Sequence, residues 1–348
     1  MNHTALAVHT AVIAALLLTA LALPSAAVIT VNWNGTGDHT TIWAAVGAAV
    51  DGDTVLVAQG TYSGAQNTGV YFSGKNIDFR SEDGEEVTII DGDGQFHAFT
   101  IADALQDSTT AVRGFTFLNC WTSGGGGALA ISNSAPIVED CVFEGCAAEG
   151  NGGAIAFSSS SATVRDCVFR ANSTLGYRGG AIFSYNSNVT VSRCLFDENI
   201  GAPTYRGGAV YMHYTSDIYT NCTFTESQYD AVVVNYSPGF RMMNCIVAGT
   251  VDGVGVADAE ADGTEISHCV VFGNANGDSL ADHYHDNLFV DPLFCDPPGD
   301  DYTHCSDSPC LPGVNVWGET VGLGIDGCNP CDVPVEGASW GGIKALFR

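Results

Sequence analysis

Two copies of the segment Tyr-Arg-Gly-Gly-Ala carry the side chains best suited to hold a ligand. Each copy is followed, four residues after its alanine, by a further aromatic or imidazole ring. Rings beside guanidinium groups suit an acidic or neutral oligosaccharide, because sugars stack on rings and carboxylates pair with guanidinium in a bidentate way. In the alternative, these side chains lie at solvated corners and pair with local carboxylates. The candidate ligand-binding residues are Tyr177, Arg178, Tyr185, Tyr205, Arg206 and His213.

A His-x-His segment offers metal ligands of a different kind. Two imidazoles two residues apart on a strand point to the same side, and a carboxylate flanks them at each end. The sequence shows no third fixed ligand, and the segment precedes a loop. The candidate metal-binding residues are Asp282, His283, His285 and Asp286.

Calcium is the other ion to consider, because clustered carboxylates supply its oxygen ligands. Asp-Gly-Asp occurs at 51–53 and at 91–93, and a looser cluster contains Asp296, Asp300 and Asp301. None of these matches the loop pattern D-x-[DN]-x-[DN]-G, and Asp-Gly pairs are common turn residues. We therefore predict no cofactor, with Ca²⁺ as the alternative.

The residue types give little support for catalysis. Glycoside hydrolysis requires two carboxylates about 5 to 10 Å apart, but with 39 acidic residues in the chain such pairs carry no information. No cysteine has a definable base beside it that would make it a nucleophile. The sequence thus favours binding over catalysis.

A repeat must position these side chains. Its two markers recur every 26 to 28 residues, a period typical of a solenoid. Gly-Gly-Ala occurs at 126–128, 152–154, 179–181 and 207–209, and Cys-x-Phe at 141–143, 167–169, 194–196 and 222–224. The unit is rich in Gly, Ser, Thr and Asn, and its apolar residues alternate with a period of two, so each unit is one coil of short β-strands. Fainter copies extend the array to about nine coils.

Equivalent residues of successive coils should stack on one another. The repeat phenylalanines are predicted to form an internal aromatic ladder and the repeat cysteines a column of buried thiols. Asparagines five residues after a cysteine are predicted to form an amide ladder at a bend. The three sets are Phe143, Phe169, Phe196 and Phe224; Cys141, Cys167, Cys194, Cys222, Cys245 and Cys269; and Asn172, Asn199 and Asn274.

The Gly-Gly-Ala-Ile and Cys-x-Phe-x-x-Asn elements resemble those of right-handed parallel β-helix repeat proteins of the pectin-lyase-like superfamily, including the repeats of chlamydial polymorphic outer-membrane proteins. Residues 40–62 resemble the amino-terminal cap of that superfamily, a short helix followed by the first strand. The resemblance covers residues 40–295 and implies an all-β, right-handed parallel β-helix solenoid. The Asn-x-Asp, Asp-Asp and Gly-His-Gly elements of polygalacturonases and the Arg-x-Pro-x-x-Arg of the lyases are absent.

The segment that begins at residue 291 is similar to the Cys-rich closing segment of bacterial secreted β-helix proteins, which covers the last coil. Such a C-terminal cap would protect unpaired strand edges. We expect disulfides within it, with the pairing left open and Cys331 as the odd thiol. A further disulfide is expected where two cysteines follow ladder phenylalanines on adjacent coils. The disulfide candidates are Cys120, Cys146, Cys295, Cys305, Cys310 and Cys328.

The two ends of the chain point to export. An apolar stretch at 11–23, then Pro24 and small residues, is typical of a secretory signal, with a short anchoring helix as the alternative. The final ten residues are similar to the sorting tags of some secreted bacterial repeat proteins, with a docked terminal helix as the alternative. The expected organisation is a signal peptide at 1–27, the β-helix with its N-terminal helix cap at 28–290, the Cys-rich cap at 291–331, and a linker with a short tag at 332–348.

The net charge of -28 argues against nucleic acid or an anionic membrane surface as a partner. No stretch after the signal is long enough to span a membrane. We therefore expect an exported, monomeric, non-catalytic β-helix protein of the bacterial cell surface or extracellular space that binds a glycan or a protein along its lateral face. The alternatives are a polysaccharide lyase or glycoside hydrolase, and a purely structural surface rod.

Overall fold

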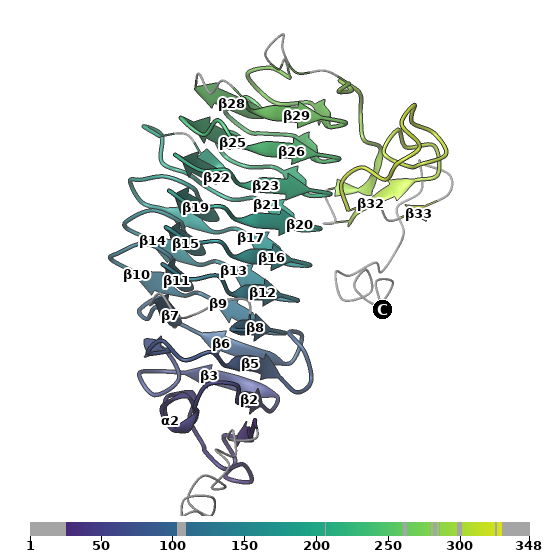
Figure 1. Cartoon of the computed structure of the whole chain (residues 1–348). Coiled ribbons are helices and arrows are strands. Elements are labelled where there is room, and N and C mark those ends of the chain that lie inside the picture. Colours follow the sequence, from purple (N-terminus) through teal and green to yellow (C-terminus); the bar gives the residue numbers. More distant parts are fainter. Residues whose placement is uncertain are drawn as a thin grey trace, which may run out of the picture.

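Stacked coils of β-strand make up most of the molecule, as the computed structural model in Figure 1 shows. The structure describes residues 26–102, 109–205, 207–259, 263–278, 280, 284, 286–297, 301–323 and 326–328. Three long parallel sheets, called A, B and C and defined by their strands below, run the length of the solenoid. Each full coil contributes one strand to sheet C, then one to sheet A and then one to sheet B. This confirms the all-β parallel solenoid of about nine coils that the sequence predicts, since sheet B has nine strands.

The strands of the three long sheets are short. Sheet A contains β1 (Val28–Val31), β2 (Thr54–Val57), β5 (Asp78–Ser81), β8 (Ala111–Arg113), β12 (Ile137–Glu139), β16 (Thr163–Arg165), β20 (Thr190–Ser192), β23 (Ile218–Thr220), β26 (Arg241–Met243) and β29 (Glu265–Ser267). Sheet B contains β3 (Gly60–Ser63), β6 (Thr88–Asp91), β9 (Thr116–Leu118), β13 (Val142–Glu144), β17 (Val168–Arg170), β21 (Leu195–Asp197), β24 (Thr223–Thr225), β27 (Ile246–Ala248) and β30 (Val270–Phe272). Sheet C contains β4 (Val70–Tyr71), β7 (Phe99–Ala102), β11 (Leu129–Ser132), β15 (Ile155–Ser158), β19 (Ile182–Tyr185), β22 (Gly207–His213), β25 (Asp230–Asn235) and β28 (Val256–Ala259).

Two small sheets complete the described strands. Sheet D contains β10 (Trp121–Thr122), β14 (Ala147–Ala148) and β18 (Ser173–Thr174), and it lies between sheets B and C along the chain. Sheet E contains β31 (Phe294–Asp296), β32 (Asp301–Cys305) and β33 (Asp326–Cys328).

The coils bend where single residues adopt left-handed backbone conformations. The residue before each ladder cysteine does so between sheets A and B, for example Asp166 (φ 55°) and Arg193 (φ 49°). The glycine pairs are required for a different reason, which is that the backbones of adjacent coils approach each other closely at these positions. A Cβ on Gly153 would lie 2.0 Å from the carbonyl oxygen of Gly180, so no larger residue fits.

The predicted internal ladders are confirmed. The rings of Phe143, Phe169, Phe196 and Phe224 stack in sequence, with centroids 4.6 to 4.8 Å apart. The six ladder cysteines are fully buried beside them and form no disulfides. Asn172 donates from Nδ2 to Asn199 Oδ1 over 3.0 Å, which is one step of the expected amide ladder, and Asn274 accepts from the backbone of Thr250 at the same bend.

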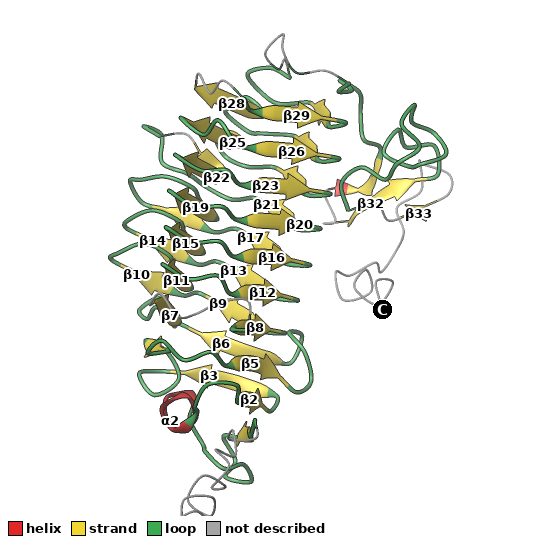
Figure 2. Cartoon of the chain, viewed as in Figure 1, coloured by secondary structure: helices red, strands yellow, loops and turns green. Residues whose placement is uncertain are grey.

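The helix α2 (Ile42–Ala48) lies at the N-terminal end of the solenoid, as Figure 2 shows. Thr41 is its N-cap, accepting a hydrogen bond from the amide of Ala44. Lys75 donates to the carbonyl oxygens of Val46 and Gly47 at the other helix end, where a positive charge is favoured. The helix cap expected from residues 40–62 is therefore present, although the strand β1 precedes it and pairs with β2.

The Cys-rich C-terminal segment is also present, but its position differs from the expectation. Sheet E lies against the side of the solenoid, where Tyr302 packs on Val168 and Leu195 of sheet B (Figures 1 and 2). Leu280 and Tyr284, from an earlier segment, pack against the main core. The reason is that sheet B exposes apolar side chains on its outer face, which needs covering as much as the last coil does.

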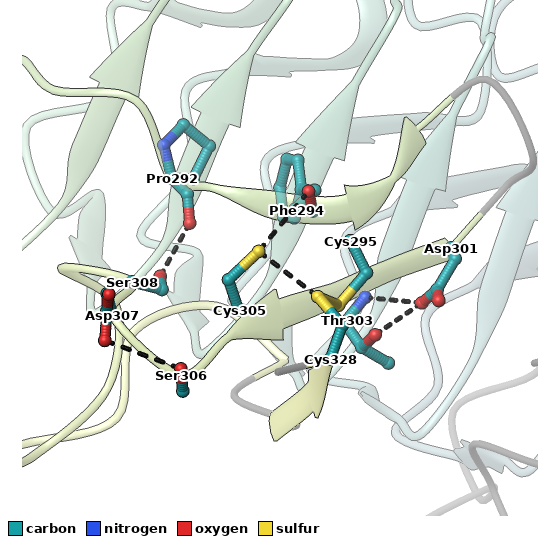
Figure 3. Close-up of a disulfide and its surroundings, with 10 residues drawn as sticks. All are labelled: Pro292, Phe294, Cys295, Asp301, Thr303, Cys305, Ser306, Asp307, Ser308 and Cys328. Carbon is teal, nitrogen blue, oxygen red and sulfur yellow. Dashed lines mark hydrogen bonds between the residues drawn. A yellow bond between two sulfur atoms is a disulfide. The ribbon is translucent and has the colours of Figure 1, made fainter. Parts of the chain in front are cut away.

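The described cysteines form one disulfide, Cys295–Cys328 in sheet E (Figure 3). The predicted Cys120–Cys146 disulfide is wrong, because both residues are buried thiols. Neighbouring parallel strands hold equivalent side chains about 4.8 Å apart and parallel, whereas a disulfide needs Cβ atoms about 3.8 Å apart. The Cys146 thiol instead donates to the carbonyl oxygen of Phe117, over 3.4 Å.

Two of the cap cysteines are also outside the disulfide, contrary to expectation. Cys310 is a buried thiol packed with Ile246, Val270 and Val321, so it serves as a small apolar side chain under the cap. Cys305 is a thiol whose Sγ lies 3.2 Å from that of Cys328. The signal peptide up to residue 25, Cys331 and the C-terminal tag lie outside the described residues. Within the described parts of the chain, no helix is long and apolar enough to cross a membrane.

Candidate functional site

The outer face of sheet C changes from small to large side chains partway along the solenoid. Ala130 on β11 and Ala156 on β15 are followed in register by Phe183 on β19 and Tyr211 on β22. Two residues further along each of these strands, Ser132 and Ser158 are followed in register by Tyr185 and His213. This change in size produces a step on the surface at β19.

A groove of about 520 Å³ lies at this step. Strands β11 and β15 contribute one part of its lining, mostly through alanine and serine, together with Ile131 and Phe157, and Asn151 also belongs to the lining. Four larger side chains contribute the other part, namely Arg178, Phe183, Tyr185 and His213. No aspartate or glutamate belongs to its described lining, although the chain has 39 acidic residues.

Arg178 is held by aromatic rings. Its guanidinium carbon lies 4.5 Å from the ring centroid of Tyr205 and 5.2 Å from that of Tyr211. Its backbone amide donates to Asn151 Oδ1, which ties the turn before β19 to the preceding coil. Its Nε is buried and has no hydrogen-bond partner among the described residues. The cation is thus placed by cation–π contacts, with polar N–H groups left over for a ligand.

Arg178 differs in this respect from the other arginines that the structure describes. Each of the others forms an ion pair with an aspartate or glutamate, whereas Arg178 pairs with no carboxylate of the described residues. In the alternative interpretation, this arginine pairs with a local carboxylate. No described carboxylate forms such a pair with Arg178.

Four rings form an exposed aromatic cluster where the middle strands of sheet C end. Tyr185 stacks on His213 with centroids 5.7 Å apart, and Tyr214 lies 4.2 Å from His213. Tyr236 continues the cluster by stacking on Tyr214 at 5.6 Å. The three tyrosines are exposed, so the cluster offers ring faces and hydroxyl groups to solvent.

His213 joins the aromatic cluster to the groove. Burial, and then the positive charge of Arg178, lower the pKa of His213 below its usual value, so that its imidazole is neutral at pH 7. Its Nδ1 is buried without a hydrogen-bond partner among the described residues. A neutral imidazole can either donate or accept a hydrogen bond, which suits a hydroxyl-rich ligand.

The structure brings together most of the residues that the sequence singled out. Arg178, Tyr185 and His213 line the groove, and Tyr205 supports Arg178. Tyr177 stacks on Tyr205 with centroids 6.3 Å apart, as the repeat predicts, but does not line the groove. The equivalent arginine of the second copy, Arg206, lies outside the described residues.

Sequence reasoning missed Phe183, Tyr211, Tyr214 and Tyr236. The first two were detectable, because each lies two residues before a predicted site residue and so points to the same face of its strand. Tyr214 and Tyr236 adopt left-handed backbone conformations at the end of sheet C, with φ 56° and 47°. A tyrosine at such a corner has no local sequence signal.

Most of the metal candidates lie outside the described residues, so their prediction is not tested. Asp282, His283 and His285 lie outside them, and Asp286 is exposed, with its backbone carbonyl accepting from the amide of His268. Within the described chain, the one group of three or more His, Cys, Asp or Glu side chains with converging ligand atoms is Cys295, Cys305 and Cys328.

The carboxylates of the Asp-Gly segments accept hydrogen bonds from backbone amides at turns. Both carboxylate oxygens of Asp53 accept backbone hydrogen bonds, from Val50 and Ala27, and these bonds lower the pKa of Asp53. Asp51 accepts from the amide of Asn76, and Asp91 from that of Asp93. At least one oxygen of each of these three carboxylates therefore accepts a backbone amide at a turn.

Comparison with known proteins bears on the fold. The model of the right-handed β-helix region matches residues 29–205 and 177–292. No curated protein matches the chain. Among solved structures, the chain is similar to a mutant of the PL6-family alginate lyase AlyGC, at 14% identity and a TM-score of 0.39. That match covers 67% of this chain and 37% of the lyase, so the chain spans little more than a third of that protein. Because the β-helix model covers most of its length, this chain belongs to the family of right-handed β-helix proteins.

Proposed function

We propose that this protein is an exported, non-catalytic β-helix that binds a glycan in the groove on sheet C. One observation carries the proposal: Arg178 lies on two tyrosine rings, beside the groove's aromatic side chains, without a carboxylate partner among the described residues. A uronic acid carboxylate is a natural partner for such a guanidinium, and sugar rings stack on tyrosine.

The absence of acidic residues from the described lining supports binding rather than hydrolysis. A glycoside hydrolase needs two carboxylates close to the scissile bond, and the described residues that line the groove supply none. The Cys295–Cys328 disulfide supports an oxidising compartment and hence export. The surplus of acidic residues elsewhere would repel a highly charged polymer, so a ligand with scattered carboxylates suits this groove best.

The test is retention on immobilised polysaccharides, some neutral and some containing uronic acids. Arg178→Ala should weaken retention of the acidic glycan about tenfold or more, because a charge-assisted hydrogen bond contributes roughly 1.5–3 kcal/mol. Arg178→Lys should restore little of it, since lysine lacks the planar fork that pairs with a carboxylate in a bidentate way.

Arg165→Ala is the matched control. It removes the same charge from the outer face of sheet A, where Arg165 pairs with Glu139, and should leave retention unchanged. Equal loss in both variants would mean that only net charge matters, and would contradict a site at Arg178. Absorbance at 235 nm and reducing-end assays in the same incubations detect lyase and hydrolase products. Product from the wild-type protein would overturn the non-catalytic proposal, and no retention of any glycan would favour a structural rod.

A further inference from the structure

Three cysteines meet on one face of sheet E, away from the groove. Cys295 comes from β31, Cys305 from β32 and Cys328 from β33. Their three sulfur atoms all lie within 4.8 Å of one another. Cys295 and Cys328 form the disulfide, and the Cys305 Sγ lies 3.2 Å from the Cys328 Sγ.

The arrangement of the three sulfurs suits an exchange reaction. Figure 3 shows the Cys328 sulfur between those of Cys305 and Cys295. A thiolate attacks a disulfide sulfur in line with the bond that breaks. An in-line arrangement would place the Cys305 and Cys295 sulfurs about 5.3 Å apart, whereas they lie within 4.8 Å of each other. Cys305 is therefore in contact with Cys328 but must rotate into line before it attacks, with Cys295 as the leaving group.

We propose that Cys295, Cys305 and Cys328 form an exchangeable disulfide site. The Cys305 thiolate attacks the Cys328 Sγ, the Cys305–Cys328 bond forms, and the Cys328–Cys295 bond breaks. The electron pair of the broken bond stays on the Cys295 sulfur, which takes up one proton in place of the proton that Cys305 lost. The reaction is redox-neutral and needs no external oxidant or reductant.

The cap can accommodate both isomers. Cys305 and Cys328 lie opposite each other where the register of the pair β32–β33 shifts, and their sulfur atoms are already 3.2 Å apart, unlike those of residues in a regular parallel ladder. The contacts that hold the cap on the solenoid use the other face of β32, where Tyr302 donates to Asp197 over 2.8 Å. Exchange therefore changes the cross-link without removing the contacts between the cap and sheet B.

The exchange also changes which thiol is accessible. Cys305 is 1% exposed, whereas Cys295 is 8% exposed. Both side chains are buried, and exchange moves the thiol to the less enclosed of the two positions, so alkylation of Cys295 reports the exchange. The cap becomes a site of modification at Cys295 only after exchange.

Disulfide mapping of the full chain under native conditions tests the proposal. The protein is incubated with iodoacetamide at pH 6 and at pH 8.5, quenched with acid, digested with pepsin at low pH, and analysed by mass spectrometry. We expect the Cys305–Cys328 cross-link to accumulate together with alkylated Cys295. The rate should rise up to tenfold per pH unit, since the thiolate is the attacking species, and should not depend on protein concentration.

Three variants separate exchange from other causes. Cys295→Ser should contain a Cys305–Cys328 disulfide, and Cys305→Ser should keep Cys295–Cys328 with no alkylation of Cys295. Cys310→Ser, whose thiol is buried elsewhere under the cap, should behave as the wild type. The proposal is overturned if, after a day at pH 8.5, the wild type contains only Cys295–Cys328. It is also overturned if Cys295→Ser, folded by circular dichroism, leaves Cys305 and Cys328 as thiols.

Discussion

Replacing Phe196 by alanine is expected to lower the free energy of unfolding by about 3–5 kcal/mol. Phe196 is fully buried in the middle of the aromatic ladder, with its ring 4.7 Å from that of Phe169 and 4.6 Å from that of Phe224. Its removal leaves a cavity that the rigid stack of coils cannot close, and it breaks both of these stacked ring contacts at once. Urea denaturation followed by circular dichroism measures the loss.

Phe289→Ala is the control for that experiment. Phe289 is 51% exposed, and its truncation should change the free energy of unfolding by no more than about 0.5 kcal/mol. Because each coil contacts only its neighbours, the Phe196 variant is also expected to show a broader unfolding transition. A loss below about 1 kcal/mol at Phe196 would mean that the ladder is not tightly packed, and would contradict the in-register stack.

The second large effect is expected at Asp217, and it depends on pH. Asp217 is fully buried in an inward-facing column that also contains Ala162, Val189 and Phe240. Its Oδ1 accepts from the amide of Val189 over 2.7 Å, but its Oδ2 has no partner among the described residues. Burial raises the pKa of this carboxyl from 3.8 to about 7.

The raised pKa sets the sign of the pH dependence. Between pH 4 and pH 7 the folded protein holds a proton on Asp217 that the unfolded chain has released, so stability falls as the pH rises through this window. Relative to an Asp217→Asn variant, wild-type stability should therefore fall by roughly 4 kcal/mol between pH 4 and pH 8, at about 1.36 kcal/mol per pKa unit. Taking the difference between the two proteins removes the contributions of the other titrating groups.

Urea denaturation of both proteins at intervals of pH measures this difference. Asp197→Asn is the matched control, because Asp197 is equally buried but accepts from Tyr302 and Thr225 and pairs with Arg170. It should be less stable than the wild type at pH 8, in contrast to Asp217→Asn. A pH-independent difference between the wild type and Asp217→Asn would show that this carboxyl is solvated in the folded protein.

Much of the fold was predictable because a parallel solenoid converts a sequence period into a spatial register. Once Cys-x-Phe recurs at nearly constant spacing, its members must stack, and both the aromatic ladder and the thiol column follow. The stacked pairs of Tyr177 with Tyr205 and of Tyr185 with His213 were predictable for the same reason. The bends were less so, since residues as different as Asp166, Arg193 and Ala171 adopt the same left-handed conformation.

Contacts between segments far apart in the chain were not predictable from a period. The cap packs on sheet B through Tyr302 and Asp197, and Cys295 pairs with Cys328 rather than with another cysteine of the cap. Neither contact repeats, so neither leaves a periodic signal, and four cysteines alone allow three pairings. The buried Asp217 was also invisible, because only the register shows that it lies in an apolar column.

The sequence by itself determined that this chain is a β-solenoid, which face each repeat residue occupies, and that aromatic rings and arginine meet on one side of it. These properties follow from local alternation and a fixed period. Only the tertiary structure decided that Arg178 lies on Tyr205 and Tyr211 without a carboxylate among the described residues, and that a groove opens where small outward residues give way to large ones. The physical reason is that pairing and shape depend on distances between coils and on side-chain volume, which residue spacing does not specify.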